Sequence, residues 1–291
     1  MARIENHKYS IEEAFRECFY IVPDYQREYV WTDKEVNQLL DDINEQIGNG
    51  HIHEYFIGTI LVSPTLQKSH YEVIDGQQRL TTFFLLLCAL KHMFRGEAQH
   101  QTISGLISTS YTDNNGETRT NLKLEPRYEN AGEVIAKLVE LDGDPQAVRA
   151  GIQAAGIPSF GSLENLVNAY STIYRYLKDN YDDTSTLKKY WGYLANNVVF
   201  IQISTDVSSA LKIFETINER GVGLNPMDLL KNLLFTQVPQ TQFTQLKDEW
   251  KTRAPLTASS PASSRADVVF PAPPLGLAKE MTGMEAHYVN Y

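Results

Sequence analysis

Cysteine and long apolar runs are scarce in this sequence of 291 residues. Both cysteines, Cys18 and Cys88, lie in apolar stretches. We therefore expect buried free thiols rather than a disulfide framework, as suits a reducing cytoplasm. No apolar run reaches about 18 residues, the length that a membrane-spanning helix needs. The opening MARIENHKYSIEEAF is charged and lacks the apolar core of a secretory signal. The sequence thus predicts a cytoplasmic protein without a membrane span.

Positive charge is also in short supply, because 26 basic residues face 36 acidic ones and the net charge is −10. A protein that coats nucleic acid needs the opposite balance. Any contact with DNA must therefore come from a local patch or from a partner chain. The hydrophobic content of 42% and charged content of 21% are ordinary for a globular protein. The length allows one large domain or two modest ones.

Strand and helix patterns are both present along the chain. The stretches Tyr55–Val62 and Tyr71–Ile74 predict the two strands of a hairpin, and Val198–Ile203 predicts a buried strand. Leu80–Phe94 is apolar on nearly every side, so we expect a helix at the centre of the core. Further helices are predicted near residues 11–19, 33–47 (after a capping box of Thr32 and Glu35), 129–140, 144–155, 162–177, 186–195, 206–217 and 226–235.

Composition divides the chain into four predicted parts. Residues 1–96 form an α+β core, and residues 97–130 form a polar, irregular, variable insertion with a turn at Asn114–Gly116. Residues 131–250 form a mainly helical region that is expected to complete the functional site of the core. Residues 251–291 are rich in Pro, Ala and Ser without periodicity, which predicts a disordered or aberrant tail.

The stretch YEVIDGQQRLTT places polar residues between a predicted strand and the apolar helix. A helix start leaves N–H groups unpaired, and its dipole favours an anion. Gly76 permits close backbone approach, Gln77 and Gln78 add amides, and Arg79 adds a planar fork suited to phosphate. Asp75 is a candidate ligand for a divalent metal. The alternative is a structural corner, in which Asp75 caps the helix and Arg79 pairs with a surface carboxylate.

Two other segments place polar residues in apolar surroundings, Tyr25–Arg27 and Asn218–Gly221. An arginine beside a helix end is commonly a capping or solvated group. Three of them, Arg27, Arg79 and Arg220, nevertheless support the hypothesis that they converge on one anion.

Three blocks occur in order along the chain: PDYQREYVWTDKEVNQLLDDI, then YFIGTILV with YEVIDGQQRLTT, then FETINERGVGLNPMDLLKNLLF. Together they resemble the N-terminal domain of the GmrSD family of modification-dependent restriction and phage-defence proteins. The resemblance implies an α+β fold similar to ParB and sulfiredoxin, with a small mixed sheet and helices followed by a mainly helical region. It also implies a nucleotide-binding core in residues 1–96 and Mg²⁺-dependent NTP hydrolysis that licenses cleavage of modified DNA.

Site residues carry over from the same resemblance. The catalytic residues it implies are Asp75, Gln77, Gln78 and Arg79, with Mg²⁺ held by Asp75. The nucleotide-binding residues it implies are Tyr25, Gln26, Arg27, Gly76, Arg79, Thr81, Asn218 and Arg220.

Members of this family commonly carry an HNH-type nuclease domain, which needs grouped histidines, whereas this chain has no histidine between residues 101 and 286. His51 and His53 either ligate a metal or lie in a solvated loop. Cleavage of DNA would therefore require a nuclease domain or subunit elsewhere. Two alternatives stay open beside the NTPase: a non-catalytic sensor of modified DNA, and a truncated inactive remnant. The sequence leaves a homo-oligomer open as well.

Overall fold

The structure is a computed structural model that describes residues 4–24, 26–48, 53–158, 161–181 and 183–206. Its strands are β1 Glu5–Ser10, β2 Phe19–Val22, β3 Tyr55–Pro64, β4 His70–Asp75, β5 Ser108–Thr112, β6 Thr118–Leu122, β7 Leu124–Pro126 and β8 Val198–Ser204. Its helices are α1 Ile11–Glu17, α2 Asp33–Gly48, α3 Gln77–Met93, α4 Ala98–Ile107, α5 Ala131–Leu141, α6 Pro145–Ala154, α7 Ser162–Asn180 and α8 Thr184–Asn197.

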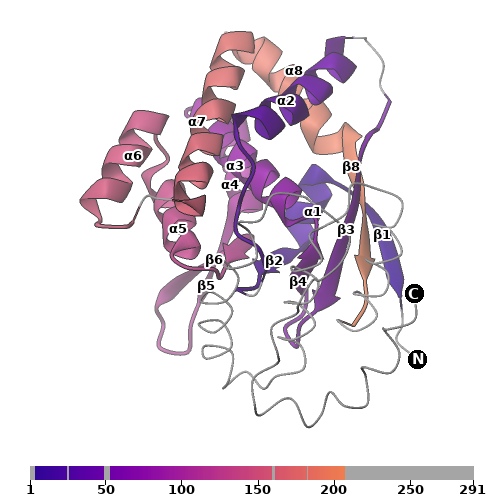
Figure 1. Cartoon of the computed structure of the whole chain (residues 1–291), viewed down its shortest axis with the longest axis vertical. Helices are drawn as coiled ribbons and strands as arrows, with labels where there is room; N and C mark the ends of the chain where they lie inside the picture. The colour runs from indigo at the N-terminus through magenta and orange to yellow at the C-terminus, as the bar shows by residue number, and fades with distance from the viewer. Residues whose placement is uncertain (1–3, 25, 49–52, 159–160, 182, 207–291) are drawn as a thin grey trace, which may run out of the picture. The chain divides into compact units, whose positions relative to one another are not determined.

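Six strands form one mixed sheet in the order β1-β8-β3-β4-β2-β7, and β5 and β6 form a separate hairpin (Figure 1). β3 and β4 pair antiparallel, which confirms the predicted hairpin. β8 lies between β1 and β3, antiparallel to the first and parallel to the second. β2 pairs parallel with both β4 and β7. The predicted mixed α and β fold is therefore confirmed.

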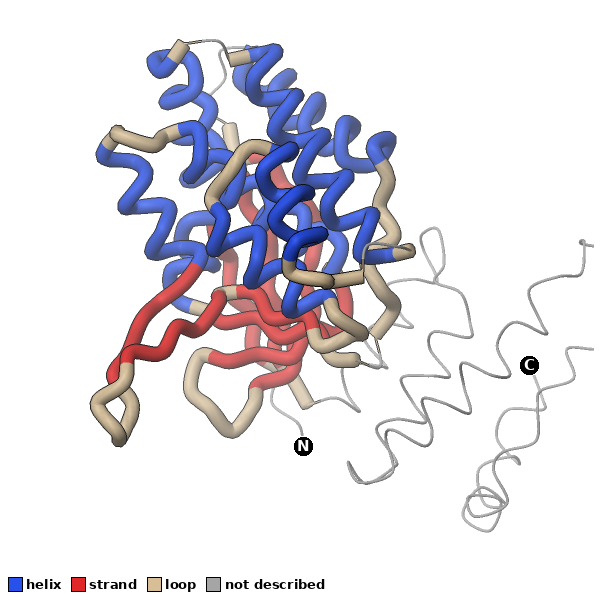
Figure 2. Tube along the Cα trace, turned by 90° about the vertical axis from the view of Figure 1, so that its left-hand side faces the viewer, coloured by secondary structure: helices blue, strands red, loops and turns tan. Residues whose placement is uncertain are grey.

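Helix α3 is the centre of the core. Its residues from Leu80 to Leu90 are all buried, which confirms the prediction drawn from a stretch that is apolar on nearly every side. The helix packs against α4 on one side and α7 on another. Figure 2 shows the helices gathered above the strands, with the β5–β6 hairpin projecting from the body.

Helix starts follow local side-chain chemistry. The Glu35 carboxylate accepts from the Thr32 N–H at 2.8 Å, just before the start of α2. This is one of the two hydrogen bonds of the predicted capping box. Asp183 accepts from the N–H groups of Ser185 and Thr186 and so caps α8. The helices predicted near 129–140, 144–155, 162–177 and 186–195 correspond to α5, α6, α7 and α8.

Residues 97–130 contain more regular structure than their polar composition suggests. They include α4, the β5–β6 hairpin and the short edge strand β7. The predicted turn lies at the tip of the hairpin, where Gly116 has a φ of 80° and Asp113 Oδ1 accepts from the Asn115 N–H. Only Ile103, Leu106 and Ile107 of α4 are buried, so this helix needs few apolar residues and its sequence reads as polar. The domain boundaries at 96, 130 and 250 stay predictions.

Cys18 and Cys88 are free and buried, as predicted. No described helix is both long enough and apolar enough to cross a membrane. The helices predicted after Asp206 and the tail 251–291 lie outside the described residues.

Candidate anion site at the start of helix α3

Gly76 forms the whole joint between β4, which ends at Asp75, and α3, which begins at Gln77. Its φ is 88°, in the left-handed region, and a Cβ atom there would lie 2.3 Å from Ile60 Cδ1. The conformation therefore favours glycine, and any side chain would also have to displace the end of the Ile60 side chain. The Gly76 N–H donates to the Asp75 carboxylate. Because glycine has no capping side chain, the next N–H groups of α3 receive no cap from this position.

Arg79 reaches back from α3 to strand β3. Its Nη1 donates to the carbonyl oxygen of Ile57 at 2.6 Å and its Nη2 to that of Thr59 at 2.9 Å. These carbonyls lie where the pairing of β3 with β8 shifts register, between Phe56 and Thr59. Gly58, between them, has a φ of 98°, and a Cβ atom there would lie 2.4 Å from Arg79 Nη1. The guanidinium thus occupies the room that a β-bulge and a missing side chain leave open.

The same guanidinium lies 3.8 Å from an oxygen of Asp75. Burial raises the pKa of the Asp75 carboxyl, although Arg79, the Gly76 N–H and Arg27 each lower it. Burial lowers the pKa of Arg79, and Asp75 opposes that change. Asp75 keeps 37% of its side chain exposed. The joint therefore holds a fixed cation, Arg79, and an accessible carboxylate, Asp75. Neighbouring positive groups compensate the charge of this carboxylate only in part.

Two glutamine side chains of α3 hold the segment 26–31, which we call the strap. Gln77 Nε2 donates to the carbonyl oxygen of Arg27 at 2.9 Å, and Gln78 Nε2 donates to that of Glu28 at 3.0 Å. Gln78 Oε1 accepts from two strap N–H groups, those of Val30 at 2.9 Å and Trp31 at 3.3 Å. Gln78 therefore binds the strap through both ends of its amide.

The strap has three further attachments. Gln26 Nε2 donates to the carbonyl oxygen of Ile74 at 3.2 Å. Tyr29 donates its hydroxyl to Thr82 Oγ1 at 2.8 Å, because the Thr82 hydroxyl itself donates to a carbonyl of α3. Asn165 Nδ2 of α7 donates to the carbonyl oxygen of Tyr29 at 3.3 Å. These contacts set the position of Arg27 relative to the start of α3.

The structure brings most of the predicted site residues to this one place. They are Gln26, Arg27, Asp75, Gly76, Gln77, Gln78 and Arg79. Thr81 is buried within α3, at 3% exposure. Tyr25, Asn218 and Arg220 lie outside the described residues, as does His51. Among the described residues, no group of three or more His, Cys, Asp or Glu side chains is arranged to hold a metal ion.

Sequence reasoning missed Gly58, although a signal for it was present. A lone glycine inside the β-branched stretch YFIGTILV is typical of a bulge or a close approach. It also missed the use of Gln78 and Thr82 as anchors for the strap, which no local pattern reveals.

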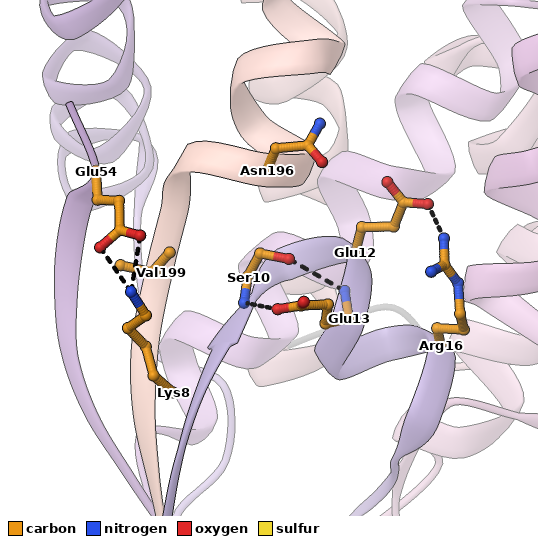
Figure 3. Close-up of a pocket in the computed structure, with 8 residues that line it drawn as sticks. All are labelled: Lys8, Ser10, Glu12, Glu13, Arg16, Glu54, Asn196 and Val199. Carbon is orange, nitrogen blue, oxygen red and sulfur yellow. Dashed lines mark hydrogen bonds and ion pairs between the residues drawn. The ribbon is translucent and has the colours of Figure 1, made fainter. Parts of the chain in front are cut away.

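A polar hollow of about 430 Å³ lies elsewhere, lined by Lys8, Ser10, Glu12, Glu13, Arg16, Glu54, Asn196 and Val199 (Figure 3). Both of its cations are already paired: Lys8 bonds to Glu54 at 2.7 Å, and Arg16 bonds to Glu12. The third glutamate, Glu13, accepts from the Ser10 N–H in the capping box of α1. None of the predicted site residues lines the hollow. Because each charged side chain of the hollow already has a partner, the joint before α3 is the stronger candidate site.

Similarity to known proteins indicates the family of the chain. The family model described as the N-terminal domain of the GmrSD restriction endonuclease matches residues 7–235. The chain belongs to this family. The matched range of this GmrSD N-terminal domain includes the strap, the joint and α3. The chain is also similar to the uncharacterized protein MJ0686 of Methanocaldococcus jannaschii, at 21% identity over 253 residues. That alignment covers 79% of this chain and 40% of the relative's length.

Proposed function

We propose that this chain is the NTP-binding and NTP-hydrolysing regulatory part of a modification-dependent DNA restriction or phage-defence system. Membership of a restriction endonuclease domain family supports the setting. In this proposal DNA, a nuclease domain or subunit and further copies of the chain are its partners. The system would operate in the cytoplasm, where NTP and invading DNA are both found.

The observation that carries the proposal is the pairing of a fixed cation with an uncapped helix start at a glycine joint. The first N–H groups of α3, together with Arg27 and the N–H groups of Arg79 that β3 leaves free, would bind the phosphates. Backbone amides at a helix start are fixed before the ligand arrives, so little reorganisation is needed when negative charge develops during phosphoryl transfer.

In this proposal Asp75 holds Mg²⁺. Its carboxylate keeps 37% of the side chain exposed, so an ion can reach it. Burial raises the pKa of this carboxyl, so a further cation beside it would be favourable. Mg²⁺ usually takes one or two carboxylates and completes its shell with substrate phosphates and water, so a single protein carboxylate is sufficient. When bound, the ion would neutralise charge on the transferred phosphate.

Release of inorganic phosphate from each of the four NTPs, with Mg²⁺, tests the proposal. Asp75→Asn should abolish release while the protein stays folded, because the amide keeps the shape and loses the charge. Asp179→Asn, at an exposed position near the end of α7, is the matched control and should keep the wild-type rate. Equal rates for both variants would refute the assignment of Asp75. Nucleotide binding without any release would favour the sensor of modified DNA.

A further inference from the structure

One atom beside the joint has no role in the interactions described so far. Gln77 is 7% exposed, and its Oε1 is buried without a hydrogen-bond partner among the described residues. The Nε2 atom of the same amide is satisfied by the Arg27 carbonyl. Leaving a buried acceptor unpaired costs about 1–3 kcal/mol, so such atoms are few in folded proteins and call for a reason.

The position of this oxygen ties it to the candidate site. Gln77 is the first residue of α3, and its amide lies between the helix start and the strap. Arg27, the strap residue it holds, also acts electrostatically on Asp75. The unpaired acceptor therefore belongs to the group of residues that surrounds the joint.

The chemistry of an acceptor excludes phosphate as its partner. Phosphate oxygens of a bound nucleotide are themselves acceptors, and an amide oxygen has no proton to donate. The N–H groups and guanidinium of the site account for the anionic part of a ligand. The oxygen of Gln77 requires a different part, one that carries an O–H or N–H group.

Building on the proposed function, we infer that Gln77 Oε1 accepts a hydrogen bond from the nucleoside part of the bound NTP. The donor is a ribose hydroxyl or an N–H of the base. Because Oε1 is buried, this bond requires the Gln77 side chain to turn away from Arg27, which exchanges one hydrogen bond for another. Gln77 then distinguishes a nucleoside triphosphate from bare polyphosphate, and it acts as a specificity-determining residue.

Calorimetric titration of the full chain with Mg²⁺ tests this inference. The probes are the four NTPs, their 2′-deoxy forms and inorganic triphosphate. Gln77→Met removes the acceptor together with the Nε2 donor to the strap. It should therefore weaken inorganic triphosphate only through the strap, and weaken the preferred NTP about tenfold more, because one further hydrogen bond is lost. Gln153→Met, at an exposed position on α6, should change neither affinity. If the 2′-deoxy form binds the wild type more weakly than the NTP does, by the same factor as the variant loses, the ribose is the donor. If the 2′-deoxy form binds as tightly as the NTP, the base is the donor.

A second variant separates the oxygen from the strap. Gln77→Glu keeps an acceptor and loses the Nε2 donor, so it should weaken both probes by a similar factor and preserve their ratio. If Gln77→Met loses equal affinity for NTP and for inorganic triphosphate, Gln77 serves the strap alone and the inference is overturned. The inference is also overturned if the wild type binds NTP and inorganic triphosphate with equal affinity. In those cases the proposed function stands. If no probe binds the wild type, both fall together.

Discussion

Replacing Arg79 with methionine removes the guanidinium from the bulge of β3 while keeping most of the side-chain stem. Two hydrogen bonds from a charged donor are lost, to the carbonyl oxygens of Ile57 and Thr59. Each such bond contributes about 1.5–3 kcal/mol to stability. The Arg79 side chain is 26% exposed, so water can replace part of what is lost. We therefore expect the free energy of unfolding to fall by about 2–4 kcal/mol.

Thermal unfolding followed by circular dichroism measures this loss. In a domain of 150–250 residues, 1 kcal/mol moves Tm by about 2–4 °C, so the expected decrease is roughly 5–15 °C. Arg79→Lys should lie between the wild type and Arg79→Met, because an ammonium cannot reach both carbonyls with a planar fork.

Arg127→Met is the matched control for the loss of an arginine. Arg127 is 47% exposed and pairs with Glu125 at 3.0 Å, and an exposed pair of this kind contributes at most about 1 kcal/mol. If Arg79→Met is no more destabilising than Arg127→Met, the guanidinium does not hold the bulge. Arg79 would then be free to act on a ligand alone.

Three further substitutions test the joint. Gly58→Ala should lower the free energy of unfolding by about 1–2 kcal/mol because of its left-handed φ, and further because the new methyl displaces Arg79. Since the second part is already lost in Arg79→Met, a thermal melt of the double variant should show less than the sum of the two effects. Gln78→Ala should cost about 2–4 kcal/mol and speed amide hydrogen exchange in the strap, whereas Gln153→Ala should do neither. Asp75→Asn should raise Tm at neutral pH. The pKa of Asp75 is raised in the folded state, so the wild type loses stability as the pH rises from the unfolded-state pKa to the folded-state pKa. The gain in Tm of Asp75→Asn should therefore vanish in acid, below the unfolded-state pKa, where the wild-type carboxyl is protonated in both states. A pH-independent difference would contradict that reasoning.

Much of the fold follows from short-range patterns in the sequence. The β-branched and aromatic residues of 55–62 and 71–74 predict the hairpin of β3 and β4 correctly. Leu80–Phe94 is apolar on nearly every side, which predicts the central helix, and the Asp-Gly step before it predicts a helix start at a glycine joint. These features depend on neighbouring residues, so a local reading is sufficient.

The contacts of the candidate site do not depend on neighbouring residues. Arg79 bonds to carbonyls about 20 positions earlier in the chain, and Gln77 and Gln78 bond to a strap about 50 positions away. A side-chain pattern cannot show which backbone carbonyl will face it. The edge strand β1 was missed for a related reason, because four of its six residues are exposed and it lacks an apolar alternation.

The place of β8 in the sheet has a consequence for how the chain is made. β8 ends at Ser204, yet among the strands that the structure describes it alone pairs with β1, and it also pairs with β3. During synthesis β1 therefore waits for nearly 200 further residues before it gains its partner, and β3 keeps an open edge for the same time. Pairings between such distant segments are slow to form and leave strand edges available for association with other chains. A nascent chain shorter than this length needs protection at those edges, which makes the emergence of β8 from the ribosome the step that joins β1 to β3.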